Sequence, residues 1–214
     1  MNKNIADIRR DYSLQSLTEE NIDANPIIQF KKWWDETLNS EIIEPNAMTL
    51  ATASQDGLPS ARIVLLKGFG ENGFVFFTNY DSYKGRQLTE NPKACLVFFW
   101  KEIERQVRIT GLVSKISAKE SDEYFDTRPE SSRIGAWVSP QSQVIESREW
   151  LDQQFNNLVS KMKGSEIQRP PYWGGYIVNP VMIEFWQGRP GRLHDRIQYS
   201  IEEDGRWKIE RLAP

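Results

Sequence analysis

Cysteine and histidine are almost absent from this sequence. The 214 residues include one cysteine, Cys95, and one histidine, His194. A single cysteine cannot form a disulfide within the chain, and these two residues are too few for a Cys/His site of the kind that holds zinc. The sequence therefore predicts neither an internal disulfide nor a metal site.

Long hydrophobic runs are missing as well. The longest wholly apolar run extends from Ala94 to Trp100, whereas a membrane-spanning helix needs about 20 apolar residues. The first residues, MNKNIAD, contain no apolar core of the kind that a secretory signal peptide needs. We expect no membrane-spanning segment and a cytoplasmic location.

An excess of basic residues is also lacking. Lysine and arginine number 27 and aspartate and glutamate 30, so the net charge of −3 argues against a broad basic face for nucleic acid. Arginine nevertheless outnumbers lysine by 15 to 12, and five arginines follow residue 188. The planar guanidinium is suited to phosphate and carboxylate groups. Small anionic ligands are therefore favoured, although a solvated strand position would explain any one of these arginines equally well.

Enough apolar residues are present for a folded core, because 39% of the chain is hydrophobic and 27% is charged. Residues 1–25 are polar and are expected to form a mobile N-terminal arm. Residues 26–214 show no repeat or linker and are expected to form a single domain. Asn25 and Pro26 predict the start of a helix. Its apolar face would consist of Ile27, Phe30, Trp34 and Leu38.

The sequence pattern changes from residue 47 onward. Short runs rich in Val, Ile, Thr and Phe are separated by Gly, Asn and Asp, which is typical of antiparallel strands joined by tight turns. Strands are expected at residues 48–54, 60–67, 74–79, 93–100, 106–117, 174–178, 181–187, 192–201 and 207–212. Helices are expected at residues 82–90, from 118 to about 128, and at 147–163. The sequence thus predicts a mostly β fold with peripheral helices, in which strands of the C-terminal third close a small barrel.

Two groups of cations in the first half of the chain are candidates for anion binding. Arg62 and Lys67 stand at the two ends of an apolar run, and strand alternation would place them on opposite faces. Lys84 follows a turn at the start of a predicted helix, where backbone N–H groups favour phosphate. Ordinary strand-end cations and a surface turn remain the simpler alternatives.

A third group lies near the C-terminus. Arg192, His194 and Arg196 alternate along a predicted strand, so they would repel one another unless they shared an anion. A structural histidine is the alternative. The amide- and hydroxyl-rich stretches 104–107 and 139–143 could contact the edge of a heterocycle. Neither a Ser/His/Asp set nor a glycine-rich nucleotide motif is present. Residue types and spacing alone therefore predict a β-barrel protein that binds small, phosphorylated, aromatic ligands.

Five motifs follow one another along the chain: RIVLLK at 62–67, ERQV at 104–107, SRIGAW at 132–137, FWQG at 185–188, and RLHDR at 192–196 together with WKI at 207–209. In this order they resemble the motifs of the pyridoxine (pyridoxamine) 5′-phosphate oxidase family. The resemblance covers nearly the whole chain and implies an FMN-binding split β-barrel that works as a homodimer, with the flavin at the subunit interface.

The resemblance also implies a set of residues that hold FMN, part of which comes from the second subunit. Tyr83 stands where the family usually has a second cation, directly before the lysine of the phosphate seat. The whole set consists of Arg62, Ile63, Val64, Leu65, Leu66, Lys67, Phe77, Thr78, Tyr83, Lys84, Gln106, Gln141, Ser142, Trp186 and Arg196.

A second set is implied for the substrate. Spacing of four would place two of its members, Tyr124 and Arg128, on one helix face. Arg196 and His194 are implied as the catalytic groups, which would polarise the hydroxyl or amine that is oxidised. The substrate set consists of Lys67, Tyr124, Arg128 and Ser132 at the phosphate, Arg192, Leu193 and His194 at the pyridine ring, and Arg9, Arg10 and Tyr12 in a lid formed by the arm.

The reaction implied by the resemblance is the oxidation of pyridoxine 5′-phosphate or pyridoxamine 5′-phosphate to pyridoxal 5′-phosphate. A hydride would pass to the flavin, and dioxygen would be reduced to hydrogen peroxide. Two alternatives stay open. One is a flavin or F420-type reductase with a related barrel, and the other is a non-catalytic protein that binds a vitamin B6 compound or flavin.

Overall fold

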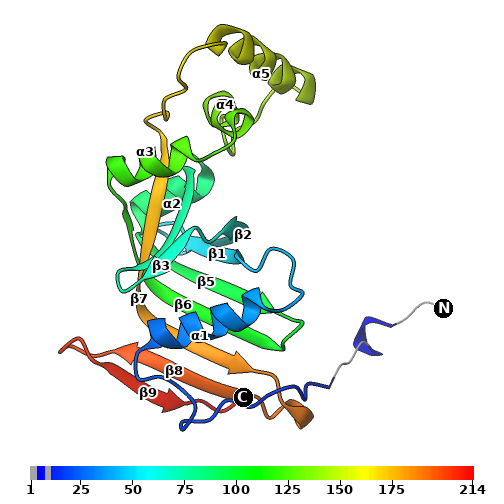
Figure 1. The fold of residues 1–214 in the computed structure, drawn as a ribbon, viewed down its shortest axis with the longest axis vertical. Helices are drawn as coiled ribbons and strands as arrows, with labels where there is room; N and C mark the ends of the chain where they lie inside the picture. The colour runs from blue at the N-terminus through cyan, green and yellow to red at the C-terminus, as the bar shows by residue number, and fades with distance from the viewer. Residues whose placement is uncertain (1–3, 8–10) are drawn as a thin grey trace. The chain divides into compact units, whose positions relative to one another are not determined.

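The computed structural model describes residues 4–7 and 11–214, and this part of the chain is mostly β (Figure 1). No helix within these ranges is both long and apolar enough to cross a bilayer. The strands are β1 Ala47–Ala53, β2 Pro59–Leu65, β3 Gly68–Gly70, β4 Gly73–Asn79, β5 Lys93–Trp100, β6 Arg105–Lys115, β7 Trp173–Gln187, β8 Asp195–Ile201 and β9 Trp207–Arg211. The α-helices are α1 Pro26–Leu38, α2 Tyr83–Glu90, α3 Ala118–Asp126, α4 Glu130–Val138 and α5 Arg148–Met162.

The chain forms two compact units. The first consists of Met1–Thr49, Cys95–Gly111 and Pro180–Pro214, and the second of Leu50–Ala94 and Leu112–Asn179. The boundaries fall inside strands β1, β5, β6 and β7. The division into a mobile arm and one domain at residue 26 stays a prediction.

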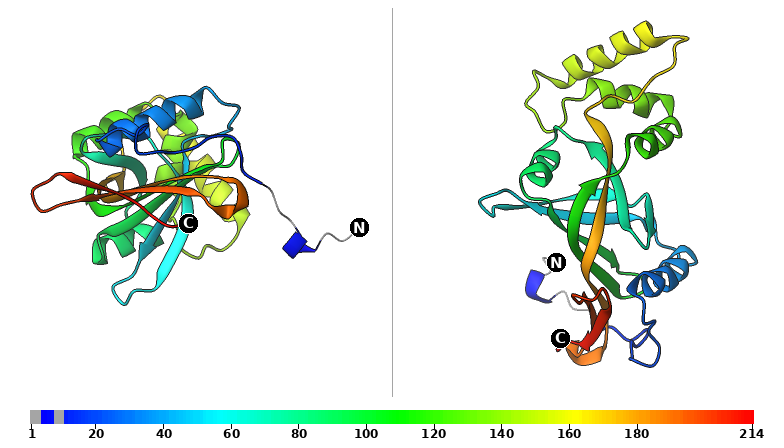
Figure 2. Two further views of the ribbon diagram at one scale, coloured as in Figure 1. Left: turned by 90° about the horizontal axis from the view of Figure 1, so that it is seen from below. Right: turned by 90° about the vertical axis from the view of Figure 1, so that its left-hand side faces the viewer.

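The strands pair in the order β2-β1-β5-β6-β7-β4-β3, while β8 pairs with β7 and with β9. Within the second unit, the start of β7 is antiparallel to β4, with Trp173 opposite Asn79. Within the first unit, the end of β7 is antiparallel to β8, with Gln187 opposite Asp195. The hairpin of β8 and β9 is drawn in orange and red in both views of Figure 2.

Local signals explain where several elements begin. The side chain of Asn25 accepts hydrogen bonds from the backbone N–H groups of Ile27 and Ile28, which caps α1 as predicted. Ser117 and Glu120 form the predicted capping box of α3. Gly73, the first residue of β4 after the turn from β3, has a φ of 125°, a conformation that favours glycine.

The core of the first unit is aromatic. Phe30 and Trp33 of α1 are buried, and their ring centroids lie 5.3 Å from Phe98 and 5.1 Å from Phe185, respectively. The predicted apolar face of α1 was wrong at its end, because Leu38 is 55% exposed and Trp33 supplies the buried ring. Helix α1 therefore packs against β7, which pairs with β8, and these two strands carry C-terminal candidate residues.

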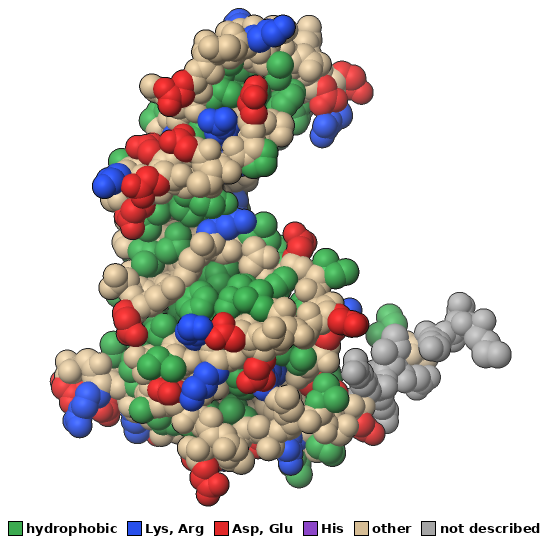
Figure 3. All heavy atoms as spheres, viewed as in Figure 1, with side chains coloured by type: hydrophobic (Ala, Val, Ile, Leu, Met, Phe, Trp, Pro, Cys, Tyr) green, Lys and Arg blue, Asp and Glu red, His purple; other side chains and the backbone are tan. Residues whose placement is uncertain are grey.

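The core of the second unit centres on Phe125, Ile134, Ile167 and Trp173. Helix α5 packs against this cluster through Phe155, Leu158 and Met162, although no residue of α5 is fully buried. Acidic and basic side chains of the described residues are interspersed on the face shown in Figure 3.

Three features differ from the sequence-based expectation. Helix α4 was not predicted: the expected helix ends at about residue 128, and the next residue, Pro129, occupies the N-cap of α4. The two strands expected at 174–178 and 181–187 are one strand, β7. Strand β8 begins at Asp195 because Pro190–Arg192 forms a 3-10 turn in which Arg192 has a φ of 62°. The expected strand alternation of Arg192, His194 and Arg196 is therefore wrong.

Two helical glycines allow a matched test of packing in the second unit. A Cβ on Gly85 of α2 would lie 2.0 Å from the carbonyl oxygen of Tyr80, whereas a Cβ on Gly135 of α4 would meet nothing within 4 Å. We expect Gly85→Ala to lower the free energy of unfolding by about 1–3 kcal/mol, because backbone must move. We expect Gly135→Ala to raise it by about 0.5–1 kcal/mol, because alanine favours the helix. Urea unfolding checks both, and equal stabilities would contradict the packing at Gly85.

Candidate functional site

A cavity of about 500 Å³ lies within the second unit. Of the residues that the structure describes, four cations and no acidic side chain line it, so its charge is suited to anions. Twelve of its lining residues belong to the sets implied by the resemblance, and Pro129 and Trp173 were not anticipated. The lining consists of Arg62, Ile63, Val64, Leu65, Lys67, Phe77, Thr78, Lys84, Tyr124, Arg128, Pro129, Ser132, Gln141 and Trp173.

Lys84 forms one end of the cavity, in the first turn of α2. Its Nζ lies 3.0 Å from Oε1 of Gln141, 3.2 Å from Oγ1 of Thr78 and 3.4 Å from Oγ of Ser82. Burial, together with the nearby charge of Arg62, lowers the pKa of Lys84 to about 8. An anion at this end would favour the charged form of the lysine.

Arg62 is held beside Lys84 by neutral oxygens. Its Nη1 donates to the carbonyl of Leu50 at 3.2 Å and to Oγ1 of Thr52 at 2.6 Å, and its Nη2 donates to Oγ of Ser60 at 2.5 Å. Burial lowers the pKa of Arg62. Because these partners carry no negative charge, the positive charge of the guanidinium is positioned without being neutralised.

The other end of the cavity is formed by Lys67, Tyr124, Arg128 and Ser132. The ring of Tyr124 stacks on Phe77 with centroids 3.8 Å apart. Nζ of Lys67 lies 6.0 Å from the Tyr124 ring centroid. Helix α3 ends at Asp126, so Arg128 follows the helix and the predicted common helix face was wrong, yet both side chains line the cavity.

Helix α4 contributes its N-terminus to the same end of the cavity. Pro129 at its N-cap and Ser132 in its first turn line the cavity, and no side chain of the described residues caps the helix. Helix N-termini carry a partial positive charge and unpaired N–H groups. The lining therefore includes two groups of potential anion-binding residues, one with Lys84 of α2 and one at the start of α4, and these are called the α2 end and the α4 end of the cavity.

The predicted placement of Arg62 and Lys67 on opposite strand faces was wrong, because β2 ends at Leu65 and both cations line one cavity. Six predicted cofactor residues are not part of its lining, and three of them belong to the second unit. Leu66 is buried, Tyr83 is 42% exposed with Arg86 over its ring, and Ser142 is exposed with a φ of 69°.

A second group of predicted residues lies in the first unit. The ring of Tyr12 lies edge-on to Trp186 and His194, with centroids 5.7 and 5.8 Å away, and Trp186 lies 4.6 Å from His194. Nδ1 of His194 accepts a hydrogen bond from the backbone N–H of Arg189 at 3.1 Å. In the neutral ring the proton then sits on Nε2, which makes Nε2 a donor. A Cβ on Gly188 would lie 2.7 Å from Tyr12, so the glycine permits this packing.

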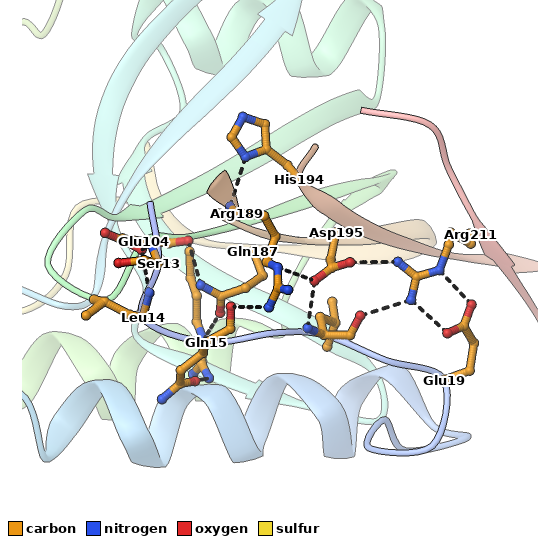
Figure 4. Close-up of polar contacts among 12 residues, drawn as sticks. Ser13, Leu14, Gln15, Glu19, Glu104, Gln187, Arg189, His194, Asp195 and Arg211 are labelled. Carbon is orange, nitrogen blue, oxygen red and sulfur yellow. Dashed lines mark hydrogen bonds and ion pairs between the residues drawn. The ribbon is translucent and has the colours of Figure 1, made fainter. Parts of the chain in front are cut away.

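Carboxylates fix the segment that carries Tyr12 (Figure 4). Oε2 of Glu104 accepts hydrogen bonds from the backbone N–H groups of Ser13 and Leu14 at 2.8 and 3.1 Å. Oδ2 of Asp195 accepts one from Leu17 at 3.0 Å. Arg9 and Arg10, which were assigned to the lid, lie outside the described residues.

Arg196 is oriented by a buried carboxylate. Its Nε and Nη2 lie 2.9 and 3.1 Å from the two oxygens of Glu184, which is 2% exposed, and Arg108 pairs with the same carboxylate. This pairing raises the pKa of Arg196. Glu184 was not among the residues predicted from the sequence, although a single acid within the apolar run 181–186 was a signal. Of the other predicted residues, Gln106 is half-buried in β6, and Arg192 and Leu193 are exposed.

Comparison with family models gives two matches. Residues 34–159 match a model described as pyridoxamine 5′-phosphate oxidase. Residues 173–214 match a model described as the pyridoxine 5′-phosphate oxidase C-terminal dimerisation region. The two matches span both units of the chain.

Individual relatives agree with these models. A pyridoxine/pyridoxamine 5′-phosphate oxidase from Nostoc punctiforme is 61% identical over 214 residues, which is 100% of both chains. One from Cupriavidus pinatubonensis is 53% identical over 210 residues, covering 98% of this chain and 99% of the relative.

Solved structures show the same fold. PhzG from Burkholderia lata, in complex with tetrahydrophenazine-1-carboxylic acid, has a TM-score of 0.88 and 30% identity, covering 94% of this chain and 100% of that one. An oxidase-related protein from Nostoc punctiforme has a TM-score of 0.69 at 18% identity, covering 86% and 97%. The predicted mostly β split barrel with peripheral helices is confirmed, as is the prediction of an oxidoreductase. The chain belongs to the pyridoxamine 5′-phosphate oxidase family.

Proposed function

We propose that this protein oxidises pyridoxine 5′-phosphate or pyridoxamine 5′-phosphate to pyridoxal 5′-phosphate, with FMN as cofactor and dioxygen as the electron acceptor. The observation that carries the proposal is the cavity whose lining, among the described residues, contains four cations and no acid. Such a lining is suited to binding phosphate groups. Relatives that are 53–61% identical over nearly their full length are named for this activity.

The residues at the α2 end fit the phosphate of FMN. Lys84 and Arg62 supply positive charge, and Thr78 and Gln141 supply neutral polar groups. The wall made by residues 62–65 belongs to β2, which stands at the end of the strand order. An edge strand keeps one row of N–H and C=O groups outside the sheet's hydrogen bonding, and these groups suit the polar edge of a flavin ring.

The residues at the α4 end fit the substrate phosphate. Lys67 and Arg128 supply charge, Ser132 a hydroxyl, and the first turn of α4 backbone N–H groups. Nη1 of Arg128 is buried and has no hydrogen-bond partner within the described residues. A phosphate oxygen would satisfy this donor.

FMN, which Arg62 and Lys84 would hold by its phosphate, would supply a hydride acceptor whose electrons could then reduce dioxygen to hydrogen peroxide. The chain binds and orients the two molecules. His194 would donate a hydrogen bond from Nε2 to the substrate, and Arg196 would keep the orientation that Glu184 imposes. Proton abstraction by neutral His194 at Nδ1 is disfavoured, because that nitrogen already accepts a hydrogen bond.

We further propose that the active protein is a homodimer in which a second copy supplies part of the cofactor set. Gln106, Trp186 and Arg196 belong to the first unit and not to the cavity lining. The match of residues 173–214 to a dimerisation region supports this assembly. The cytoplasmic location also stays a prediction.

The direct test is to purify the full chain and record its visible spectrum. Flavin absorbance, aldehyde formation and hydrogen peroxide release with both phosphorylated substrates are expected. A protein that binds flavin or substrate without forming aldehyde would be the non-catalytic alternative, and this outcome would overturn the proposed activity.

Arg128→Ala should weaken the binding of phosphorylated substrate. A charge-assisted contact contributes about 1.5–3 kcal/mol, so we expect the KM for pyridoxine 5′-phosphate to rise roughly 10- to 150-fold while the flavin content stays the same. Steady-state kinetics and the flavin absorbance of the purified variant measure both quantities. Arg148→Ala, at an exposed position of α5, is the control and should change neither. Loss of flavin in proportion to activity would place Arg128 elsewhere.

The affinity for FMN should fall at alkaline pH because of Lys84. Its pKa of about 8 means that the lysine is charged at pH 7 and mostly neutral at pH 9, whereas the phosphate of FMN binds the charged form. We expect the dissociation constant of FMN to rise about tenfold between pH 7 and pH 9. Quenching of flavin fluorescence on binding to the apoprotein measures this change.

Lys84→Arg is the matched control for this pH dependence. Arginine keeps its proton throughout the range, so the variant should show a much flatter profile. The same tenfold change in Lys84→Arg would assign the pH dependence to another group.

A further inference from the structure

Arg128 is held in the cavity by aromatic rings. Its guanidinium carbon lies 4.5 Å from the ring centroid of Trp173 and 5.6 Å from that of Phe125. Among the described residues, Nη1 of Arg128 has no hydrogen-bond partner, and no carboxylate contributes to the shift in its pKa. Burial lowers its pKa, which is the expected effect when a charge loses water without gaining a counter-ion.

Trp173 is itself rigidly placed at the start of β7. Its ring is stacked against Phe77 and Tyr124 with interplanar angles of 14° and 5°, and Phe125 packs edge-on with centroids 5.3 Å apart. Its carbonyl accepts a hydrogen bond from Nη1 of Arg169 at 2.5 Å. Trp173 is 7% exposed, so its ring has little freedom to move.

An aromatic ring and a carboxylate can both hold an arginine in place, but they differ in whether its charge and N–H groups stay available to a ligand. A carboxylate would occupy N–H donors, cancel the charge and compete with an incoming phosphate. An aromatic face attracts the guanidinium through its quadrupole and offers no anionic oxygen. The charge and the N–H groups of Arg128 therefore stay available to a ligand.

We propose that Trp173 is a positioning residue that holds Arg128 for the phosphate of the substrate, and so contributes to the preference for phosphorylated over unphosphorylated ligands. This inference rests on the proposed function for the identity of the ligand. The interaction of Trp173 with Arg128 is independent of the oxidation step.

The test compares Trp173→Leu, which removes the aromatic face but keeps apolar bulk, with Trp173→Phe, which keeps a smaller aromatic face. For Trp173→Leu we expect the KM for pyridoxine 5′-phosphate to rise about tenfold and kcat to change less than about twofold. Trp173→Phe should recover most of the loss. The dissociation constants of pyridoxal 5′-phosphate and inorganic phosphate, measured by calorimetry on the flavin-loaded protein, should rise in parallel.

Two controls separate positioning from packing. Trp137→Leu alters another tryptophan that packs against the same hydrophobic cluster but does not line the cavity, and it should leave the KM unchanged. Trp173→Leu in an Arg128→Ala background should cause no further loss, because the residue to be positioned is gone. Urea unfolding and the FMN dissociation constant are measured for every variant.

The outcomes distinguish this inference from the proposed function. If Trp173→Leu weakens phosphate binding equally with and without Arg128, or if Trp173→Phe is as impaired as Trp173→Leu, Trp173 acts through packing and the inference is overturned. If the parent protein forms no aldehyde, the proposed function fails. The calorimetric comparison with inorganic phosphate still tests the coupling of Trp173 to Arg128.

Discussion

The cavity of the second unit depends on one electrostatic constraint, which is that four cations share its lining without an acidic neighbour. Like charges repel one another, and burial increases the free energy needed to keep each of these side chains charged. Neutral groups hold three of them: Arg62 binds carbonyl and hydroxyl oxygens, Lys84 contacts hydroxyl and amide oxygens, and Arg128 lies over Trp173. Each charge is therefore fixed in position but remains available to a phosphate.

In the first unit, by contrast, candidate residues are positioned by charged groups. There, carboxylates do the positioning: Glu104 binds backbone N–H groups of the segment that carries Tyr12, and Glu184 binds Arg196 through both of its oxygens. Glu184 is shared by Arg196 and Arg108, so one carboxylate faces two guanidinium groups and the group of three keeps a net positive charge. Glu184 therefore fixes the orientation of Arg196 without neutralising both arginines.

Much of the cavity could be predicted from the sequence, because its residues cluster in short motifs such as RIVLLK. Strand alternation failed for Lys67 because the strand stops at Leu65, a boundary that the sequence does not mark. Helix α4 was missed because Pro129 can end one helix or begin another. The role of Trp173 could not be predicted from the sequence, because a tryptophan at the start of a strand is usually a core residue. Only the structure shows that Arg128 lies over its ring.

The uncompensated charges also connect ligand binding to the stability of the fold. A lysine whose pKa is lowered on folding opposes folding while it is charged, so Lys84 contributes its full penalty below its folded pKa of about 8. As the pH rises from about 8 toward the ordinary lysine pKa of 10.5, Lys84 loses its proton in the folded protein before it does so in the unfolded chain. The penalty is therefore progressively relieved over this pH range. A phosphate bound beside Lys84 offsets the same penalty at neutral pH, because it binds the folded chain and not the unfolded one. The buried positive charge of Lys84 thus lowers the stability of the fold when no anion is bound, and the same charge makes the binding of an anion stabilising.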